Sequence, residues 1–323
     1  MFLMRFDMRA PEIGPATTQD LYRAALDMAA WAETHGAFQI VVSEHHGSSD
    51  GYLPSPLVLA GAIAGRTRKI PIQVAALIVP LHDPLRLAED MAVLDLASGG
   101  RVNYVTAAGY VESEFAQLDR PFKDRGRRMD ESLEAMRSAW TGEPFEYQGR
   151  TVRVTPKPAT PGGPPLFMGG NTKVAARRAA RFDMGMLAQG INRELEALYR
   201  AECERLGKRP RLCINPPPGT VTSAFVSEDP DRAWAEIGPH LLHDAMAYAA
   251  WLGDSASVTK SVAQTVDELR AQKGPYRIFT PDEALAYVKA TGLLLLHPLC
   301  GGLSPDLAWA SLELMADKVL SRL

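Results

Sequence analysis

The sequence has 323 residues, 46% of them hydrophobic, which is enough to bury a large core. Its 35 basic and 38 acidic residues give a formal net charge of −3, so we expect neither nucleic acid nor an anionic membrane among its partners. No apolar run approaches the roughly 20 residues of a membrane span, and the three cysteines show no disulfide or metal-finger spacing. The sequence therefore predicts a soluble cytoplasmic protein, and its cysteines give no sign of a metal site.

Short β-rich runs alternate with helical patterns along the chain, as in parallel βαβ units. The expected strands, in chain order, are 2–7, 38–43, 70–79, 102–107, 165–168, 184–189, 220–226 and 293–297. Eight strands with intervening helices favour an α/β fold, a (βα)8 TIM barrel with insertions. An open doubly wound sheet is the alternative, because periodicity does not show closure.

Residue patterns also mark where several helices begin. Thr17 and Asp20 form a capping-box pattern, and Asp83 precedes a first-turn proline. Further expectations are helices over 124–140, from 172 to 182 and from 304 onward, with a hairpin around 148–149. We expect a single domain over residues 1–323, with a helical insertion around 229–292 that would act as a lid.

The first candidate for chemistry is the segment Glu44, His45 and His46, directly after the second strand. In a (βα)8 barrel the carboxyl ends of the strands form the mouth of the active site. A histidine there can accept or donate a proton, and Glu44 can orient one of the imidazoles. Two alternatives stay open: a metal site, and a buried histidine with a structural role only.

Two further strand ends carry small residues. Ala75 and Ala76, at the third strand, would let a flat ligand approach the backbone, although simple core packing is the better explanation of these two residues taken alone. Gly109 and Tyr110 follow the fourth strand, where glycine permits close backbone approach and tyrosine can stack on an aromatic ligand. Glycine is also what any tight turn requires.

The turn Gly169, Gly170, Asn171 and Thr172 separates the fifth strand from a helix. The free N–H groups and the positive dipole end of a helix N-terminus bind phosphate. The alternative is that Asn171 only caps the helix. Signature motifs of nucleotide hydrolases, serine hydrolases and zinc peptidases do not occur in the sequence.

Taken in order, these segments resemble the luciferase-like flavin monooxygenases. The matching stretches are 38–46, 55–60, 66–70, 79–84, 88–90, 94–101, 125–131, 140–144 and 169–171, and the most telling is Leu94-Asp-Leu-Ala-Ser-Gly-Gly-Arg101. The resemblance implies a barrel with a flavin in its mouth. It also implies that His45 is the catalytic histidine and that a non-proline cis peptide joins Ala75 to Ala76.

By the same resemblance, Asn171 and Thr172 bind the flavin phosphate and Gly109 and Tyr110 flank the flavin. Bacterial luciferase has an arginine in the strand-four turn where this chain has Ala108, so another group must balance the phosphate charge, with Arg177 and Arg178 as candidates. The implied activity is that of an FMN-dependent monooxygenase. It would use O2 and reduced FMN from a separate flavin reductase to oxygenate a small organic substrate, and would form a homodimer.

Three alternatives remain at this point. The same family includes deazaflavin-dependent hydride transferases, and a flavin-binding protein without catalysis is a second alternative. A third is an unrelated metal-dependent barrel hydrolase that uses His45, His82 or His297, against which the missing carboxylate partners count.

Overall fold

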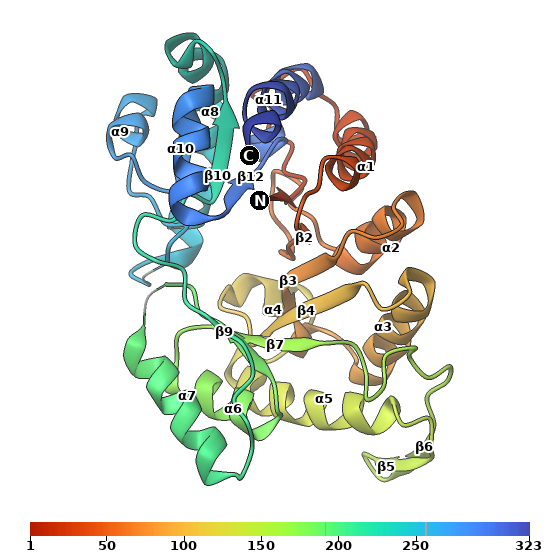
Figure 1. The fold of residues 1–323 in the computed structure, drawn as a ribbon. Coiled ribbons are helices and arrows are strands. Elements are labelled where there is room, and N and C mark those ends of the chain that lie inside the picture. The colour runs from red at the N-terminus through yellow and green to blue at the C-terminus, as the bar shows by residue number, and fades with distance from the viewer. Residues whose placement is uncertain (191, 256) are drawn as a thin grey trace. The chain divides into compact units, whose positions relative to one another are not determined.

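The computed structural model of the chain describes residues 1–190, 192–255 and 257–323. The backbone separates into two compact units. Residues Met1–Pro54 and Pro216–Leu323 form the first, here called the terminal unit, and Ser55–Asn215 form the second, the central unit. Both units have parallel strands covered by helices (Figure 1).

The strands of the terminal unit are all parallel and lie in the order β11-β10-β12-β1-β2. Their bounds are β1 Phe2–Phe6, β2 Ile40–Val42, β10 Ser223–Val226, β11 Tyr276–Phe279 and β12 Leu294–Leu296. Met4 lies opposite both Leu296 and Ile40, in the centre of this sheet. Every residue of β1 is buried, as expected for a parallel strand covered on both faces.

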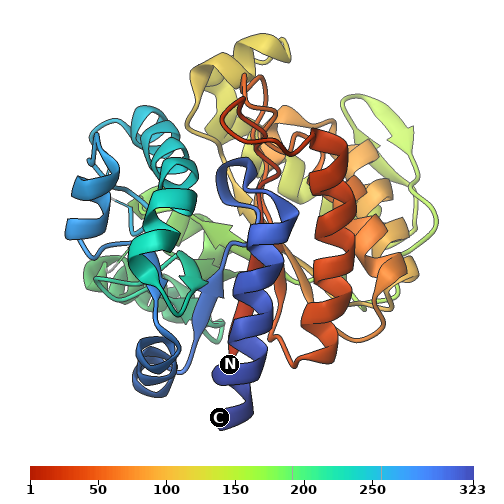
Figure 2. The ribbon, with the colours of Figure 1, turned by 90° about the horizontal axis from the view of Figure 1, so that it is seen from above.

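The helices of the terminal unit are α1 Thr18–Thr34, α8 Pro230–Leu252, α9 Val266–Ala271, α10 Pro281–Thr291 and α11 Pro305–Lys318, with short 3-10 turns at Cys300–Gly302 and Leu320–Arg322. The capping box predicted before α1 is confirmed, since Thr17 Oγ1 accepts from the Asp20 N–H at 3.2 Å and the Asp20 side chain accepts from Thr17. Helices α1 and α11 run side by side (Figure 2), where Trp31 and Trp309 meet edge to face.

The segment predicted as a helical insertion departs from the prediction in one respect. It contains a parallel strand, β11, between α9 and α10, and this strand pairs with β10 over four residues. The run Tyr276-Arg-Ile-Phe279 is β-rich but short, and periodicity does not identify a strand of this length. Within the segment expected to be helical, α9 covers only Val266–Ala271, whereas α8 continues through Pro239 without a break.

The central unit has a second set of parallel strands, in the order β3-β4-β7-β8-β9. Their bounds are β3 Ile72–Ile78, β4 Val102–Ala107, β7 Leu166–Gly169, β8 Gly185–Leu187 and β9 Cys213–Ile214. The helices are α2 Pro56–Arg66, α3 Pro84–Ser98, α4 Glu112–Gln117, α5 Arg125–Ala139, α6 Lys173–Arg181 and α7 Arg193–Arg205, with 3-10 turns at Val79–Leu81 and Phe122–Asp124. All eight predicted strands are thus confirmed, whereas β9 and the helices α2, α4 and α7 were not predicted.

The predicted hairpin of the central unit is confirmed as β5 Phe145–Tyr147 paired antiparallel with β6 Arg150–Val152. Both turn residues, Gln148 and Gly149, have positive φ angles of 49° and 70°, as a two-residue type I′ turn requires.

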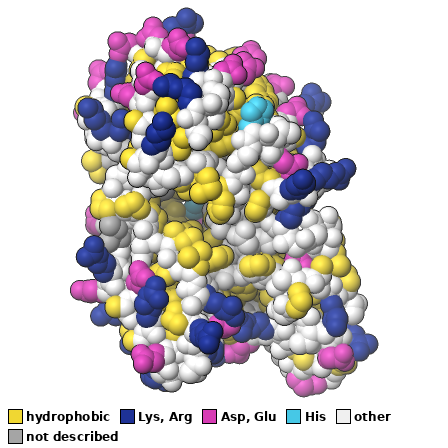
Figure 3. All heavy atoms as spheres, viewed as in Figure 1, with side chains coloured by type: hydrophobic (Ala, Val, Ile, Leu, Met, Phe, Trp, Pro, Cys, Tyr) yellow, Lys and Arg dark blue, Asp and Glu magenta, His cyan; other side chains and the backbone are white. Residues whose placement is uncertain are grey.

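The surface shows no segregation of charge on the face drawn in Figure 3, where basic and acidic side chains are interspersed. Within residues 1–190, 192–255 and 257–323, no helix has both the length and the apolar character needed to cross a membrane.

Candidate active site

His45 lies directly after β2 in the terminal unit, and aromatic rings enclose its imidazole. Its backbone N–H donates to the Leu53 carbonyl at 3.2 Å, which fixes the chain path after the strand. The imidazole stacks on Trp251 with ring centroids 4.1 Å apart and meets the Tyr52 ring edge to face at 4.8 Å. The residue is 6% exposed, so these contacts determine what can reach it.

Glu44 is buried beside the same segment and pairs with the neighbouring histidine. Its Oε1 lies 3.0 Å from His46 Nε2, and the side chain is completely shielded from solvent. This contact places the Glu44 carboxylate beside the His46 imidazole. A catalytic role for Glu44 or His45 remains a prediction.

A cluster of buried charges, here called the Arg9 cluster, lies in the same unit and was not predicted. It consists of Arg5, Asp7, Arg9, Asp50, Asp244 and His297. Arg9 Nε is 3.0 Å from Asp244 Oδ1, and Arg9 Nη1 donates to Asp50. Asp7 Oδ2 is 3.2 Å from His297 Nε2. The available sequence signal is the spacing of Arg5, Asp7 and Arg9 in an otherwise apolar stretch. Arg5 lies in β1, and Asp7 and Arg9 follow the end of this strand at Phe6.

The Arg9 cluster shifts the pKa values of its members. Burial alone would raise the pKa of Asp50, but hydrogen bonds from His243 and Arg9 hold that pKa well below its usual range. Burial would likewise raise the pKa of Asp7, yet His297, Arg5 and Arg9 keep it low. Both carboxyl groups are therefore ionised near neutral pH.

Three metal-ligating residues come together beside this cluster. Ligand atoms of Asp244, His297 and Cys300 lie within 4.8 Å of one another. The Asp244 carboxylate is, however, already paired with Arg9, and a second cation there would meet that guanidinium. Burial, together with the Asp244 and Asp7 carboxylates, raises the pKa of the Cys300 thiol well above its usual value, whereas a metal binds the thiolate. We therefore interpret the group as part of an ion-pair network.

In the central unit, the ends of β3 and β4 present small side chains. The peptide bond between Ala75 and Ala76 is cis, as the family resemblance implied. The pairing register with β4 is irregular at this point, and Ile78 then lies opposite Ala107. Ala76 and Ala107 are partly buried and pack against the cluster formed by Ile78, Leu81 and Phe115.

Gly109 and Tyr110 follow β4, and the backbone is crowded there. Gly109 has a φ angle of 82°, and a Cβ atom at this position would lie 2.7 Å from Phe115 Cε2 and 2.9 Å from Ile78 Cγ2. Only glycine fits this turn without strain. Tyr110 is 37% exposed, so part of its ring is available for stacking.

The turn after β7 begins α6, and Thr172 is the residue that caps this helix. Thr172 Oγ1 accepts from the Ala175 N–H at 3.1 Å, whereas Asn171 Oδ1 accepts from the Gln189 N–H at 2.9 Å. The alternative that Asn171 caps the helix is therefore wrong, because Asn171 ties the turn to the end of β8. Gly169 lies opposite Leu187 at the same strand ends.

The two arginines considered as phosphate partners are both paired with carboxylates. Arg178 is buried and donates to Asp130 from Nε at 2.6 Å and from Nη2 at 3.3 Å. Arg177 lies 3.4 Å from Glu202. The first turn of α6 instead carries Lys173, which is exposed, and no acidic residue. A cation at the amino end of a helix is repelled by the positive end of the helix dipole, and an anion bound there would offset this repulsion.

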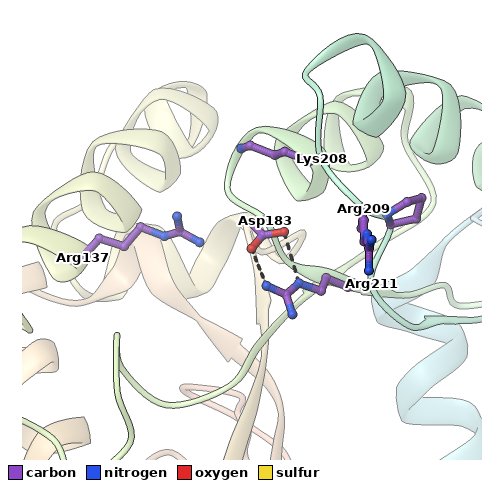
Figure 4. A pocket seen from close by; sticks show the side chains of 6 residues that line it. Arg137, Asp183, Lys208, Arg209 and Arg211 are labelled. Atoms are coloured by element: carbon purple, nitrogen blue, oxygen red, sulfur yellow. Dashed lines mark hydrogen bonds and ion pairs between the residues drawn. The ribbon is translucent and has the colours of Figure 1, made fainter.

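A basic pocket of about 570 Å³ lies at the opposite end of these strands (Figure 4). Arg211 donates two hydrogen bonds to Asp183, at 3.1 and 2.6 Å, and Lys208 Nζ donates to the Ala180 carbonyl at 3.2 Å. Arg137 donates to the Phe182 carbonyl. These cations therefore cap the carboxyl end of α6 before β8 begins, and we assign them a structural role.

Comparison with known proteins gives relatives of two kinds. An F420-dependent glucose-6-phosphate dehydrogenase from Nocardia farcinica (strain IFM 10152) is 28% identical over 220 residues, which are 64% of this chain and 63% of that protein. An FMNH(2)-dependent dimethylsulfone monooxygenase from Pseudomonas putida is 26% identical over 194 residues, which are 56% of this chain and 52% of that protein. Each match spans less than two thirds of the relative's length.

A solved structure and a family profile match more of the chain. The monooxygenase RslO1 from Streptomyces bottropensis superposes with a TM-score of 0.77 at 21% identity, covering 99% of both chains. This likeness confirms the predicted luciferase-like α/β barrel fold class. The profile of the luciferase-like monooxygenases matches residues 4–285, and the chain therefore belongs to this family.

Proposed function

We propose that the protein is an FMN-dependent monooxygenase that acts on a small organic substrate with O2 and receives reduced FMN from a separate reductase. The observation that carries the proposal is the amino end of α6. There a glycine turn, a capping Thr172 and an exposed Lys173 come together without an acidic residue in the first turn. This arrangement suits a phosphate monoester such as that of FMN.

The strand ends of the central unit fit a flat ring system. Ala76 and Ala107 are only partly buried, so we propose that a planar group lies against them. Gly169 is close-packed, since a Cβ atom there would lie 3.0 Å from Val105 Cγ1. Reduced FMN would supply the electrons that activate O2. The chain would bind the ring and the phosphate and keep water away from them.

His45 is the residue that we propose to hold or move a proton in the reaction. Its imidazole can accept or donate a proton at either ring nitrogen, and Trp251 and Tyr52 keep bulk water from the ring. We propose that buried Glu44 supports this segment through its contact with His46.

A deazaflavin-dependent hydride transferase is the second candidate, because the Nocardia relative is an F420-dependent dehydrogenase. The two candidates differ in the cofactor that binds and in the use of O2. Both share the phosphate turn, so the turn does not decide between them. The Glu44-His45-His46 stretch resembles the FMN branch of the family.

Titrating the anaerobic protein with reduced FMN and, separately, with reduced F420 tests the choice. We expect reduced FMN to bind, and its reoxidation after admission of air to proceed at a different rate from that of free reduced FMN. Binding of reduced F420 alone would support hydride transfer, and binding of neither would refute both candidates.

Substitution of His45 tests the proton role. In a screen for oxygen incorporation from labelled O2, we expect His45→Asn to lower turnover by about 10² to 10⁴-fold. His35→Asn is the matched control, because His35 is an exposed histidine at the end of α1 that stacks on Trp31. Equal turnover of His45→Asn and wild type would remove His45 from the mechanism.

A further inference from the structure

Four rings of the terminal unit pack around one another at His45. Trp251 stacks on the imidazole with an interplanar angle of 27°, whereas Tyr52 and Tyr248 approach it edge on, at centroid distances of 4.8 and 6.3 Å. His45, Tyr52 and Tyr248 are buried. Trp251 is the one of the four that is only partly buried.

The two tyrosines are held in place by hydrogen bonds. Their hydroxyl groups are 2.7 Å apart, and Arg5 Nη2 donates to the Tyr248 hydroxyl at 2.5 Å. Arg5 is itself paired with Asp7 at 3.6 Å. Moving either tyrosine would break a buried hydrogen bond, which is costly in an environment without water.

Trp251 is held more weakly than the tyrosines. Within the part of the chain that the structure describes, its indole N–H has no hydrogen-bond partner. The ring stacks on His45 and meets Tyr52 and Tyr248 edge to face, and the Arg9 guanidinium lies 4.5 Å from its centroid. Trp251 is the second-to-last residue of α8, which ends at Leu252 before Gly253. Helix ends open locally at lower free energy than helix centres.

We propose that Trp251 is a gate over His45, and that a planar aromatic ring displaces its indole and stacks on the imidazole in its place. This inference rests on the proposed role of His45. The site left by the indole would offer an imidazole face, a tyrosine edge and the Arg9 cation. A ring with an electron-rich face, such as a phenol, a fused arene or the reduced flavin ring system, satisfies all three contacts.

Chemical modification of the flavin-free protein tests the gate without any turnover. Diethyl pyrocarbonate modifies accessible imidazoles, and peptide mass spectrometry follows each histidine separately. We expect His45 in the wild type to react about ten-fold more slowly than exposed His35, and Trp251→Ala to remove most of this difference. Trp251→Phe keeps a ring and should keep the protection.

Trp251→Ala could expose His45 by destabilising the fold rather than by opening the gate. Trp251→Leu is a second variant for this reason, because leucine fills part of the space without an aromatic face. Thermal unfolding identifies any variant that has lost its fold, and the folded ones are compared. If His45 reacts at the same rate in the wild type and in every folded Trp251 variant, the gate is refuted, whatever the outcome of the FMN experiments.

Ligand titrations test the class of ring and its source. We expect 1-naphthol, or reduced FMN under anaerobic conditions, each added alone to the flavin-free wild type, to change the fluorescence of Trp251. That fluorescence is obtained by subtracting the signal of Trp251→Phe from the signal of the wild type. If only reduced FMN changes the fluorescence, the flavin ring takes the place of the indole. If only 1-naphthol does, an aromatic substrate takes that place. A response to neither, or an equal response to the aliphatic 1-octanol, overturns the proposal.

Discussion

Arg9 Nε and Asp244 Oδ1 lie 3.0 Å apart at a place where neither side chain has any exposed surface. Arg9 lies three residues after the end of β1, and Asp244 lies in the middle of α8, so the pair joins segments that are far apart in the sequence. Removing Arg9 leaves the Asp244 carboxylate buried without its paired cation, with the neutral Tyr276 hydroxyl as a donor at 2.9 Å, and desolvation of that charge is what makes the loss costly.

We therefore predict that Arg9→Met lowers the free energy of unfolding by about 3–5 kcal/mol, as measured by urea denaturation. Arg86→Met is the matched control, because Arg86 forms a pair of similar length with Asp90 on the exposed side of α3. Exposed pairs contribute about 0–1 kcal/mol. A similar small loss for both variants would show that the Arg9 cluster does not stabilise the fold.

Lowering the pH should weaken the Arg9 cluster, because it protonates the Asp50 carboxylate. The pKa of Asp50 is lower in the folded chain than in the unfolded chain, so the unfolded state takes up protons first as the pH falls. The stabilising contribution of the carboxylate is complete above the unfolded pKa of about 3.9 and is lost as the pH falls through the folded pKa.

We expect Asp50→Asn to be less stable than the wild type at pH 7, and the difference in unfolding free energy to shrink as the pH falls below about 4. Asp317→Asn, on the exposed side of α11, should keep the wild-type pH dependence. Urea denaturation at several pH values measures the difference. A difference that stays constant down to acid pH would contradict the assignment of Asp50 as an ionised partner of Arg9.

The ion-pair interpretation of Asp244, His297 and Cys300 also makes a prediction about metals. Dialysis against a chelator should leave the midpoint of thermal unfolding unchanged, and elemental analysis should find zinc only in substoichiometric amounts. A structural zinc site would behave differently, since chelators unfold proteins that depend on one. Stoichiometric zinc that is lost in Cys300→Ala would show that the three residues bind metal.

The sequence predicted the elements better than it predicted the site. Capping signals such as Thr17 with Asp20 act within a few residues, so the start of α1 could be read directly. The ring that covers His45 comes from residue 251, and no local pattern encodes a contact across about 200 residues. The same holds for Asp244, whose partner Arg9 is equally remote.

Short elements were missed for a different reason. β9 has two residues and β11 has four, which is too few for a period to repeat. The cis bond between Ala75 and Ala76 was predicted from the family resemblance, because periodicity carries no information about cis peptide bonds.

Thr172 offers a test that separates helix capping from phosphate binding. Loss of the cap in Thr172→Ala should cost about 1 kcal/mol of stability, and Thr172→Ser should retain most of it. If the same turn binds the flavin phosphate, Thr172→Ala should also weaken FMN binding by about five- to ten-fold, while riboflavin, which has no phosphate, binds as before. Equal losses for FMN and riboflavin in a calorimetric titration would place the phosphate elsewhere.

Gly109 and Gly36 separate the cost of a crowded turn from the cost of an unusual backbone angle. Both have positive φ angles, 82° and 73°, but a Cβ atom at Gly109 would lie 2.7 Å from the Phe115 ring, whereas nothing lies within 4 Å of one at Gly36. Alanine at Gly36 therefore bears only the backbone cost, about 1 kcal/mol. Alanine at Gly109 adds overpacking of a buried phenylalanine, a further 1–3 kcal/mol or so. We expect Gly109→Ala to lower the unfolding free energy two- to four-fold more than Gly36→Ala, and equal effects would show that the ring beside Gly109 moves aside freely.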